Sequence, residues 1–147
     1  MFKTLAATML AASALLSVTT ASSAFAGGCR DTVVVEQTGD WNDVAADSHG
    51  CNYTGIYVDG DFGEVTTETD GDGNAQVIGQ EGFGNSVETE LTGDDNGLGV
   101  RQAANGARAK VKMDGTRNKA AVYQLRSGAV ASFNVQGDGN TVVSHQD

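Results

Sequence analysis

The amino-acid sequence predicts an all-β protein: a β-solenoid of about five stacked 22-residue coils, with two short strands in each coil. Three observations lead to this prediction. Proline is absent from the 147 residues, although glycine occurs 20 times. Asparagine and glycine recur at a fixed spacing, and apolar and polar residues alternate between these recurrences. A chain without proline suits a fold in which nearly every backbone N–H donates to a ladder.

The shortest repeat is the step from Asn74 to Asn85, which recurs from Asn85 to Asn96. Taking this step of eleven positions from Asn52 meets asparagine at six of nine positions, and the positions three residues earlier hold glycine equally often. A fixed period of this kind is the sequence signature of stacked-repeat folds, in which a coil buries its inner face only against its neighbours.

A period of twice that length distinguishes the two corners of each coil. One corner carries Gly-x-x-Asn, with the glycines at Gly71, Gly93, Gly115 and Gly137 and the asparagines at Asn74, Asn96, Asn118 and Asn140. The other corner has a glycine directly before the repeat position, at Gly84, Gly106 and Gly128. Glycine in a tight corner supplies the positive φ angle that other residues adopt only at a cost.

Strands of about six residues are expected between the corners because side chains alternate there with period two. The segment Val87-Glu88-Thr89-Glu90-Leu91, for example, turns Val, Thr and Leu inward. Every second strand ends its inward set with glutamine, which gives a ladder of Gln80, Gln102, Gln124 and Gln146. Stacked Asn and Gln amides can hydrogen-bond from coil to coil, so these polar groups can be buried with partners.

The outward positions predict two ion pairs between neighbouring coils. Glu88 and Lys110 occupy the same position in successive 22-residue repeats, and so do Glu90 and Lys112. Exposed pairs contribute little to stability, so we expect them to fix the register of the stack more than its free energy of unfolding.

Charge is distributed unevenly along the chain. Between Asp31 and Asp95 there are 16 acidic and no basic residues, whereas the segment from Asn96 to Arg126 has seven basic residues and one acidic residue. Chain position becomes height in a solenoid, so this asymmetry favours head-to-tail addition of copies. Elongation is then expected to respond to salt and to charge reversal at Arg108, Lys110 and Lys112.

The N-terminus has the pattern of a secretory signal peptide. Lys3 precedes an apolar stretch that runs from Leu5 to Val18, and Ala24-Phe25-Ala26 provides a small-x-small cleavage site. We expect a signal peptide over residues 1–26 and one solenoid domain over residues 27–147. The apolar stretch is too short and too rich in Ala and Ser for a membrane span. A lipoprotein anchored at Cys29 would lack the usual bulky aliphatic residue three positions earlier.

The two cysteines, Cys29 and Cys51, are separated by one full 22-residue repeat. Neighbouring coils would bring them within disulfide distance, and a secreted chain with two cysteines favours the bond. A closed loop would, however, hinder passage through a narrow export pore.

Catalysis, metal binding and nucleic-acid binding are all disfavoured. His49 and His145 lie at opposite ends of the chain, no CxxC motif occurs, and the net charge is −10. We therefore expect no enzyme, no cofactor and no nucleic-acid partner. The window from Asp70 to Glu81 has oxygen side chains at calcium-loop spacing, but Ala75 stands where such a loop needs glycine. Only its Gly-x-x-Asn corner recurs along the chain.

Two motifs resemble the Gln-x-Gly-x-x-Asn core of the curlin repeat: Gln80-x-Gly82-x-x-Asn85 and Gln37-Thr38-Gly39-Asp40-Trp41-Asn42. The chain is similar to curli fibre subunits over nearly all of residues 27–147. The resemblance implies a cross-β solenoid that polymerises as functional amyloid outside a Gram-negative cell. It also implies export in the unfolded state through an outer-membrane pore and contact with other curli subunits.

Several features depart from the curlin pattern. The Gly-rich leader of major subunits is missing, the corners at Ala104 and Arg126 lack Gly-x-x-Asn, and the interval from Asn42 to Asn52 is ten residues. The sequence therefore leaves open whether the chain resembles a major subunit or a nucleator.

The expected function is that of a self-assembling subunit of extracellular fibres for adhesion and biofilm matrix. The alternative is a monomeric secreted solenoid that binds a partner on a flat face, such as an adhesin, an ice-binding module or a calcium-stabilised module. Such a module needs a regular Thr-x-Thr array or Asp ladder, and the corresponding position changes from Thr67 to Ile78 to Thr89 to Val100.

Overall fold

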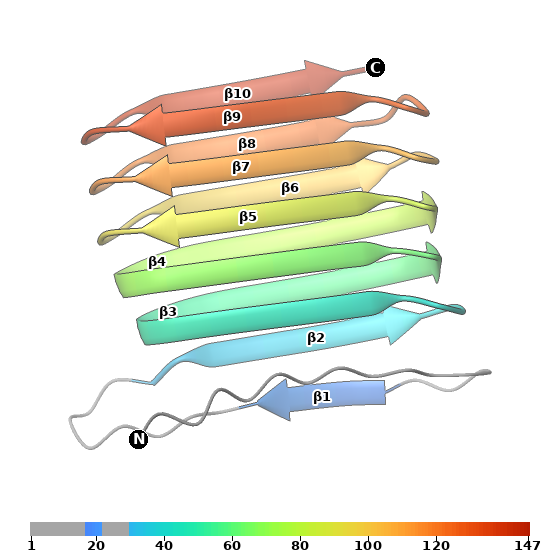
Figure 1. Ribbon diagram of the computed structural model, residues 1–147, viewed down its shortest axis with the longest axis horizontal. Helices are drawn as coiled ribbons and strands as arrows, with labels where there is room; N and C mark the ends of the chain where they lie inside the picture. The colour runs from blue at the N-terminus through green and yellow to red at the C-terminus, as the bar shows by residue number, and fades with distance from the viewer. Residues whose placement is uncertain (1–16, 22–29) are drawn as a thin grey trace.

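The computed structural model describes residues 17–21 and 30–147, and its coils stack along a single axis (Figure 1). The described residues form strands and corners without a helix. The strands are β1 (Ser17–Ala21), β2 (Thr32–Thr38), β3 (Asp43–Asp61), β4 (Glu64–Phe83), β5 (Ser86–Thr92), β6 (Gly97–Ala103), β7 (Arg108–Asp114), β8 (Lys119–Gln124), β9 (Val130–Gln136) and β10 (Thr141–Gln146).

The coils build two parallel sheets that face each other across the core. β3 and β4 each continue round a corner, so each contributes one rung to both sheets. The five-rung sheet consists of residues 43–51 and 64–72 with β5, β7 and β9. The six-rung sheet consists of β2, residues 53–61 and 75–83, β6, β8 and β10. The rungs of the front sheet run opposite to those of the rear sheet (Figure 1).

The register confirms the predicted coil. Val65 pairs with Val87 and Val87 with Ala109, so the predicted 22-residue coil holds from β4 onward. The first coils are one residue shorter, since Asp43 pairs with Glu64, and the register shifts between Cys51 and Tyr53. This shift absorbs the ten-residue interval noted in the sequence. The predicted fold class, a solenoid of about five coils, is therefore correct.

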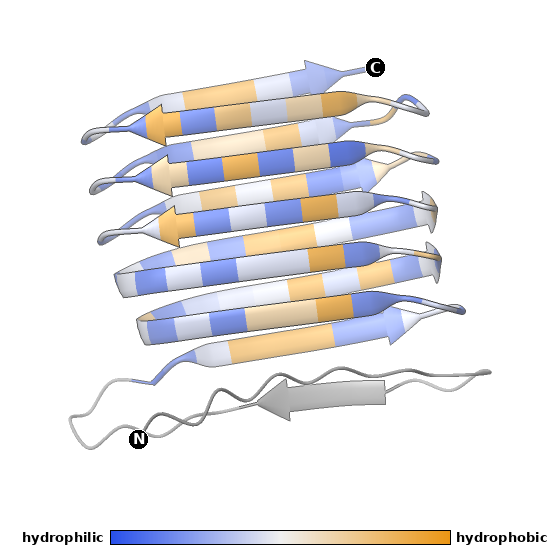
Figure 2. Ribbon diagram, viewed as in Figure 1, coloured by the Kyte–Doolittle hydropathy of each residue, from blue (hydrophilic) through white to orange (hydrophobic). Residues whose placement is uncertain are grey.

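The core lies between the two sheets and holds the inward residues of every rung. Ile78, Leu91, Met113 and Val122 are fully buried, and hydropathy alternates along the rungs (Figure 2). The coils nearest the N-terminus, which are the lower coils in Figure 1, are more polar inside. There the Gln76 amide donates to the hydroxyls of Thr54 and Thr69 at 3.1 and 2.8 Å. It also accepts a hydrogen bond from Thr89 at 2.9 Å, so its polar atoms have partners in the core.

β1 lies within the segment that the sequence assigns to a signal peptide. It pairs antiparallel with β2, with Ser17 opposite Gln37. The rest of that segment lies outside the described residues, so the cleavage site remains a prediction. No helix in the described part of the chain is long and apolar enough to cross a membrane.

Candidate self-assembly site

The asparagines at one corner form a continuous ladder. The Oδ1 atoms of Asn52, Asn74, Asn96 and Asn118 each accept the backbone N–H of the next asparagine up the stack, at 3.1, 2.9, 3.0 and 2.9 Å. The Nδ2 atoms of Asn74, Asn96 and Asn118 donate to the glycine carbonyl of the next corner, at 2.7, 2.9 and 2.6 Å. Each of these side chains thus binds the backbone of the coil above. The amide-to-amide bonds expected from the sequence also occur, since Asn74 Nδ2 donates to Asn52 Oδ1 and Asn140 Nδ2 to Asn118 Oδ1, both at 3.1 Å.

The ladder is open at its upper end. Asn140 has no coil above it in the described residues, and its Nδ2 turns to Gln136 O at 3.0 Å and Asn118 Oδ1 at 3.1 Å. No described residue pairs with the upper edges of β9 and β10. The upper end therefore presents two strand edges and the Oδ1 atom of Asn140, which together form a template for another coil.

The predicted corner glycines serve two different purposes. Gly71, Gly93, Gly115 and Gly137 have φ angles of 121, 104, 126 and 92°. A Cβ at Gly93 would lie 2.1 Å from the Gly115 carbonyl oxygen, so this corner requires glycine for both φ and space. At Gly84, Gly106 and Gly128 a Cβ would meet nothing within 4 Å, and only the positive φ favours glycine.

The predicted glutamine ladder is present along the six-rung sheet. Nε2 of Gln80, Gln102 and Gln124 donates to Oε1 of the glutamine above, at 3.0, 2.8 and 3.0 Å. The same Nε2 atoms and that of Gln146 cross the core to the carbonyls that begin the opposite rungs, those of Glu64, Ser86, Arg108 and Val130, at 2.9–3.1 Å. The ladder therefore joins the two sheets as well as successive coils.

The glutamine ladder stops at its lower end because the coil below holds an apolar residue. Val58 pairs with Gln80 in the register, and Oε1 of Gln80 is buried without a hydrogen-bond partner. An unpaired buried acceptor costs about 1–3 kcal/mol. This is a specific weak point of the first coils.

Both predicted ion pairs form on the outer face of the five-rung sheet. Lys110 Nζ lies 2.8 Å from Glu88 Oε1, and Lys112 Nζ lies 2.6 Å from Glu90 Oε1. The hydrogen bond and charge of Glu90 raise the pKa of Lys112 above its usual value. We call this outer face the charged face.

The outer face of the six-rung sheet is different in character and carries Tyr53, Tyr57 and Tyr123. These residues are 42–45% exposed, and their outward neighbours include glycines, Lys119 and the Glu81–Arg101 ion pair. The Asp59 carboxylate raises the pKa of the Tyr57 hydroxyl. We call this face the tyrosine face.

Aspartates at the corners accept backbone hydrogen bonds from the coil below. Asp72 Oδ1 accepts from Cys51 N–H at 3.1 Å, and Asp94 Oδ1 accepts from Asp72 N–H at 2.9 Å. Asp138 accepts both the N–H and the hydroxyl of Thr116 at 2.8 Å, which lowers the pKa of Asp138. Asp72 of the calcium-like window thus binds backbone, and no group of three or more His, Cys, Asp or Glu in the described residues is arranged for a metal ion.

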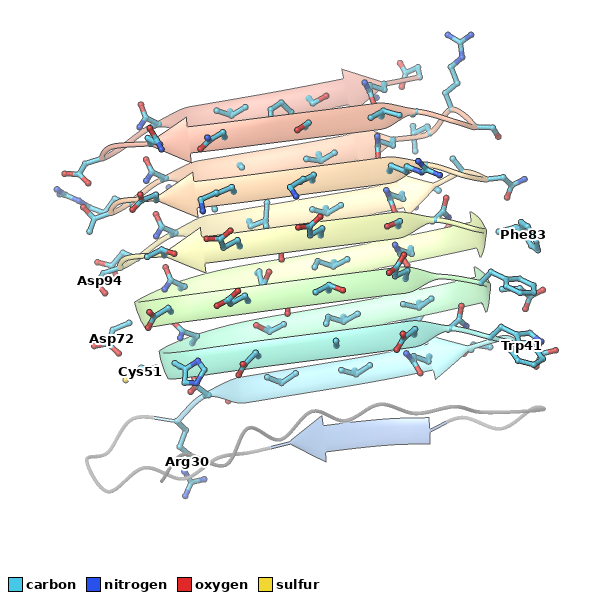
Figure 3. The ribbon with its side chains drawn as sticks, in the orientation of Figure 1. Arg30, Trp41, Cys51, Asp72, Phe83 and Asp94 are labelled. Atoms are coloured by element: carbon cyan, nitrogen blue, oxygen red, sulfur yellow. The ribbon has the colours of Figure 1, made fainter. Side chains whose placement is uncertain are left out.

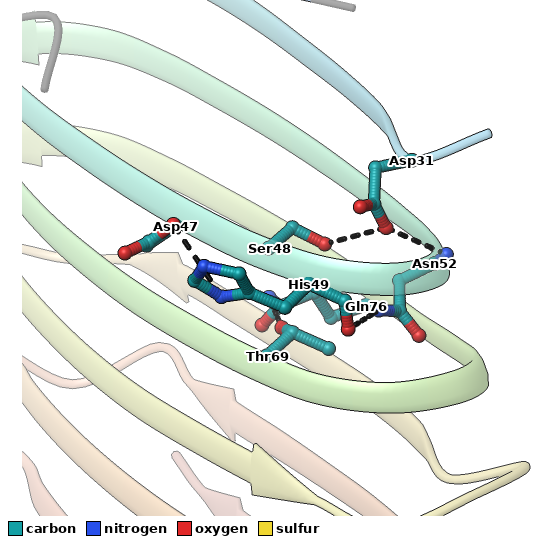
Figure 4. Close-up of polar contacts among 7 residues, drawn as sticks. All are labelled: Asp31, Asp47, Ser48, His49, Asn52, Thr69 and Gln76. Atoms are coloured by element: carbon teal, nitrogen blue, oxygen red, sulfur yellow. Dashed lines mark hydrogen bonds and ion pairs between the residues drawn. The ribbon is translucent and has the colours of Figure 1, made fainter. Parts of the chain in front are cut away.

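Asp31 takes the asparagine position at the base of the ladder. Its Oδ1 accepts the N–H of Asn52 at 2.9 Å and the hydroxyl of Ser48 at 3.0 Å (Figure 4). Asp31 is only 4% exposed. The spacing of the asparagines does not point to this position, because the first coil is one residue shorter than the repeat and Asp31 therefore lies outside the 22-residue register.

Three aromatic residues that the main repeat does not predict gather at one corner. Trp41 and Phe62 stack with centroids 6.3 Å apart, and Phe62 and Phe83 lie 5.2 Å apart. Trp41 and Phe83 project at the corner opposite Asp72 and Asp94 (Figure 3). The signal for this corner was the equal spacing of the three aromatic residues, which is one position shorter than the main repeat.

Cys51 is disulfide-bonded. Cys29, its predicted partner, lies outside the described residues. The two histidines do not meet: His49 lies near Asp47 at 3.7 Å in the first coils, whereas His145 contacts Tyr123 and Asp147 in the last.

Comparison with known protein families, curated proteins and solved structures finds no match to this chain.

Proposed function

We propose that this protein is a self-assembling structural subunit of extracellular, curli-like amyloid fibres that serve adhesion and biofilm matrix. The observation that carries the proposal is the open upper end of the stack. No described residue pairs with the upper edges of β9 and β10, and the Oδ1 atom of Asn140 is the acceptor that each asparagine below it in the ladder uses to bind the next coil. A stack whose coils bind through backbone ladders can be extended by a second copy with the same contacts.

The lower end supports the same proposal. In the full chain β1 covers the edge of β2. Cleavage after Ala26 would remove β1 and expose that edge, so export and activation for assembly would be coupled. This sequence of events suits a secreted protein that reaches the surface of a Gram-negative cell before it polymerises.

Specific features also support the alternative function, a monomeric binding module. Trp41, Phe62 and Phe83 are 52–62% exposed, and Trp41 and Phe62 have positive φ angles of 62 and 57°, at the corner where later coils use glycine. Exposed rings held in a strained backbone are typical of binding surfaces. Assembly state distinguishes the two functions.

The test uses purified protein that begins at Gly27. Time courses of thioflavin fluorescence and sedimentation are recorded with and without preformed seeds. We expect a lag phase that seeds abolish, followed by loss of the soluble protein into fibres. A chain that stays a soluble monomer at high concentration would refute fibre formation and favour the binding module.

A further inference from the structure

The stack contains an odd number of rungs. Among residues 30–147 there are eleven: six in one sheet and five in the other. The first rung, β2, and the last, β10, both belong to the six-rung sheet. One copy is therefore five and a half coils, and this half coil restricts how a second copy can be added.

A second copy added in the same orientation leaves a gap. If its β2 pairs with β10 on the six-rung sheet, then its residues 43–51 lie two rung spacings above β9 on the five-rung sheet. One rung is missing between them. The N–H and C=O groups on both sides of that gap would have no partners, which is costly for strand edges enclosed in a fibre.

A half turn about the stacking axis removes the gap. The second copy then places β2 on β9 and residues 43–51 on β10. Rungs in the two sheets run in opposite directions (Figure 1), and the half turn reverses the direction of β2, so β2 remains parallel to β9. We infer that successive copies in the fibre are related by a half turn. This inference rests on the proposed polymerisation.

The corners support the half turn independently. It brings the corner Gly39-Asp40-Trp41-Asn42 of the next copy onto Gly137-Asp138-Gly139-Asn140. Both segments have the Gly-Asp-x-Asn pattern, and both glycines have positive φ angles, 105 and 92°. Stacking without rotation would instead place Asp31 above Asn140, because Asp31 occupies the base of the same ladder.

The contacts between coils within the chain predict those at the joint, by which we mean the contact between the upper end of one copy and the lower end of the next. Asn140 Oδ1 would accept the N–H of Asn42 of the next copy, as Asn118 Oδ1 accepts that of Asn140. Asn140 Nδ2 would donate to the Gly39 carbonyl, as Asn118 Nδ2 donates to Gly137 O. Space exists for that carbonyl, since the nearest atom to a Cβ built on Gly137 is Asn140 Nδ2 at 3.7 Å.

The inner side chains at the joint are compatible as well. Val33 and Val35 of the next copy would cover Ala131 and Phe133, of which Phe133 is only partly buried in the single chain. Gln37 would reach the carbonyl that begins β10, as Gln146 reaches Val130 O at the start of β9.

The outer faces of the fibre follow from this geometry. Each side of the fibre alternates the charged face of one copy with the tyrosine face of the next. The rise per copy is five and a half coils, or about 26 Å, whereas unrotated copies with the gap would rise six coils, or about 29 Å.

Cysteine pairs on outward positions distinguish the two joints. Ser132 on β9 and Val143 on β10 occupy the same position in their rungs as Val34 in β2. The half turn brings Val34 next to Ser132, and the unrotated stack brings it next to Val143. In-register rungs are about 4.8 Å apart, within disulfide range.

The test compares fibres of Val34→Cys/Ser132→Cys with fibres of Val34→Cys/Val143→Cys after mild oxidation. Lys110→Cys/Ser132→Cys, an adjacent pair within one chain, is the control for bond geometry. We expect a covalent ladder of multimers on denaturing gels from the Ser132 pair only, and a rise of about 26 Å by electron cryomicroscopy.

The opposite result, a ladder from the Val143 pair, would overturn the half turn. Fibres in which the control pair closes and neither test pair forms multimers would also overturn it. Absence of fibres in sedimentation would instead refute the proposed function, so the two failures are distinguishable.

Discussion

At the scale of single residues, the backbone ladders determine which substitutions the fold tolerates. Asn96 and Asn118 are buried, yet their amides have partners in the coil above. Gln80 is the exception among the described ladder amides, because Val58 below it offers no donor to its Oε1. The residues at the ends of ladders are therefore where stability can be gained, and those within ladders are where it is lost.

Val58→Gln should extend the glutamine ladder by one coil. Its Nε2 would donate to the orphaned Oε1 of Gln80, and we expect the free energy of unfolding to rise by about 1 kcal/mol. Urea unfolding of the unassembled protein, followed by circular dichroism, measures the change. Val58→Glu is the matched control: it has a similar shape and no donor when ionised, and it should be destabilising. A Gln variant less stable than the natural protein would contradict the ladder account.

Three glycine-to-alanine variants should differ in cost according to their surroundings. Gly99→Ala adds a Cβ in open space at an ordinary φ and should be nearly neutral. Gly106→Ala also meets no atom but has φ 67°, so we expect a loss of about 1–2 kcal/mol. Gly93→Ala adds the clash with Gly115 O, and we expect a loss of about 3 kcal/mol or more. Equal costs in the same urea experiment would show that coil spacing does not depend on these contacts.

At the scale of the element, the short repeat predicted the strands and corners because one small unit recurs. The inward set Val87, Thr89 and Leu91 is buried, and the corner of Gly93 and Asn96 recurs in space as it does in sequence. What the pattern could not predict is the direction of the hydrogen bonds. Amide-to-amide and amide-to-backbone hydrogen bonds require the same residues, and the asparagine ladder contains both.

The first coils were the least predictable part. Asp31, Trp41 and Phe62 follow the shorter spacing of these coils, which a search at the main period does not detect. In the calcium-like window, the Asp72 carboxylate accepts a hydrogen bond from the Cys51 backbone N–H. Sequence spacing alone does not reveal this bond.

The corner at Asp138 should make stability depend on pH. Hydrogen bonds from Thr116 hold the folded pKa of Asp138 below its ordinary value of 3.8. The contribution is therefore complete above the unfolded pKa and is lost as the pH falls below it through the folded pKa. Urea midpoints measured from pH 6 to pH 2 should fall less for Asp138→Asn than for the natural protein, because the amide keeps an acceptor without titrating. Parallel curves for the two proteins would rule out this role of Asp138.

At the scale of the whole molecule, the charge asymmetry becomes a difference between the lower and upper halves of the stack. Asp31, Asp40 and Asp43 lie in the lower coils, while Arg126 lies at the corner before β9, near the upper end. Lys110 and Lys112 are already paired within the chain, so Arg126 is the better probe of contact between copies.

Arg126→Glu should slow fibre elongation by roughly threefold to tenfold, because it replaces a basic group near the upper end by an acidic one. This weakens the long-range attraction for the lower end of the incoming copy, where Asp31, Glu36, Asp40 and Asp43 outnumber Arg30. Arg101→Glu changes the net charge equally but lies in the middle of the stack, beside Glu81 at 3.5 Å. It controls for the general repulsion between copies of net charge −10. Elongation measured from fixed seeds at low salt should show the difference, and equal rates for both variants would dismiss the polarity of the ends as a factor.

The central claim is that the coil stack continues from one molecule into the next. X-ray diffraction from aligned fibres of the protein that begins at Gly27 tests this claim most directly. The account predicts a sharp reflection at about 4.8 Å along the fibre axis, from rungs perpendicular to it, and a broader one at about 10 Å across it. Aggregates whose reflection at about 4.8 Å lies across the axis, or a protein that yields no ordered fibres, would contradict it.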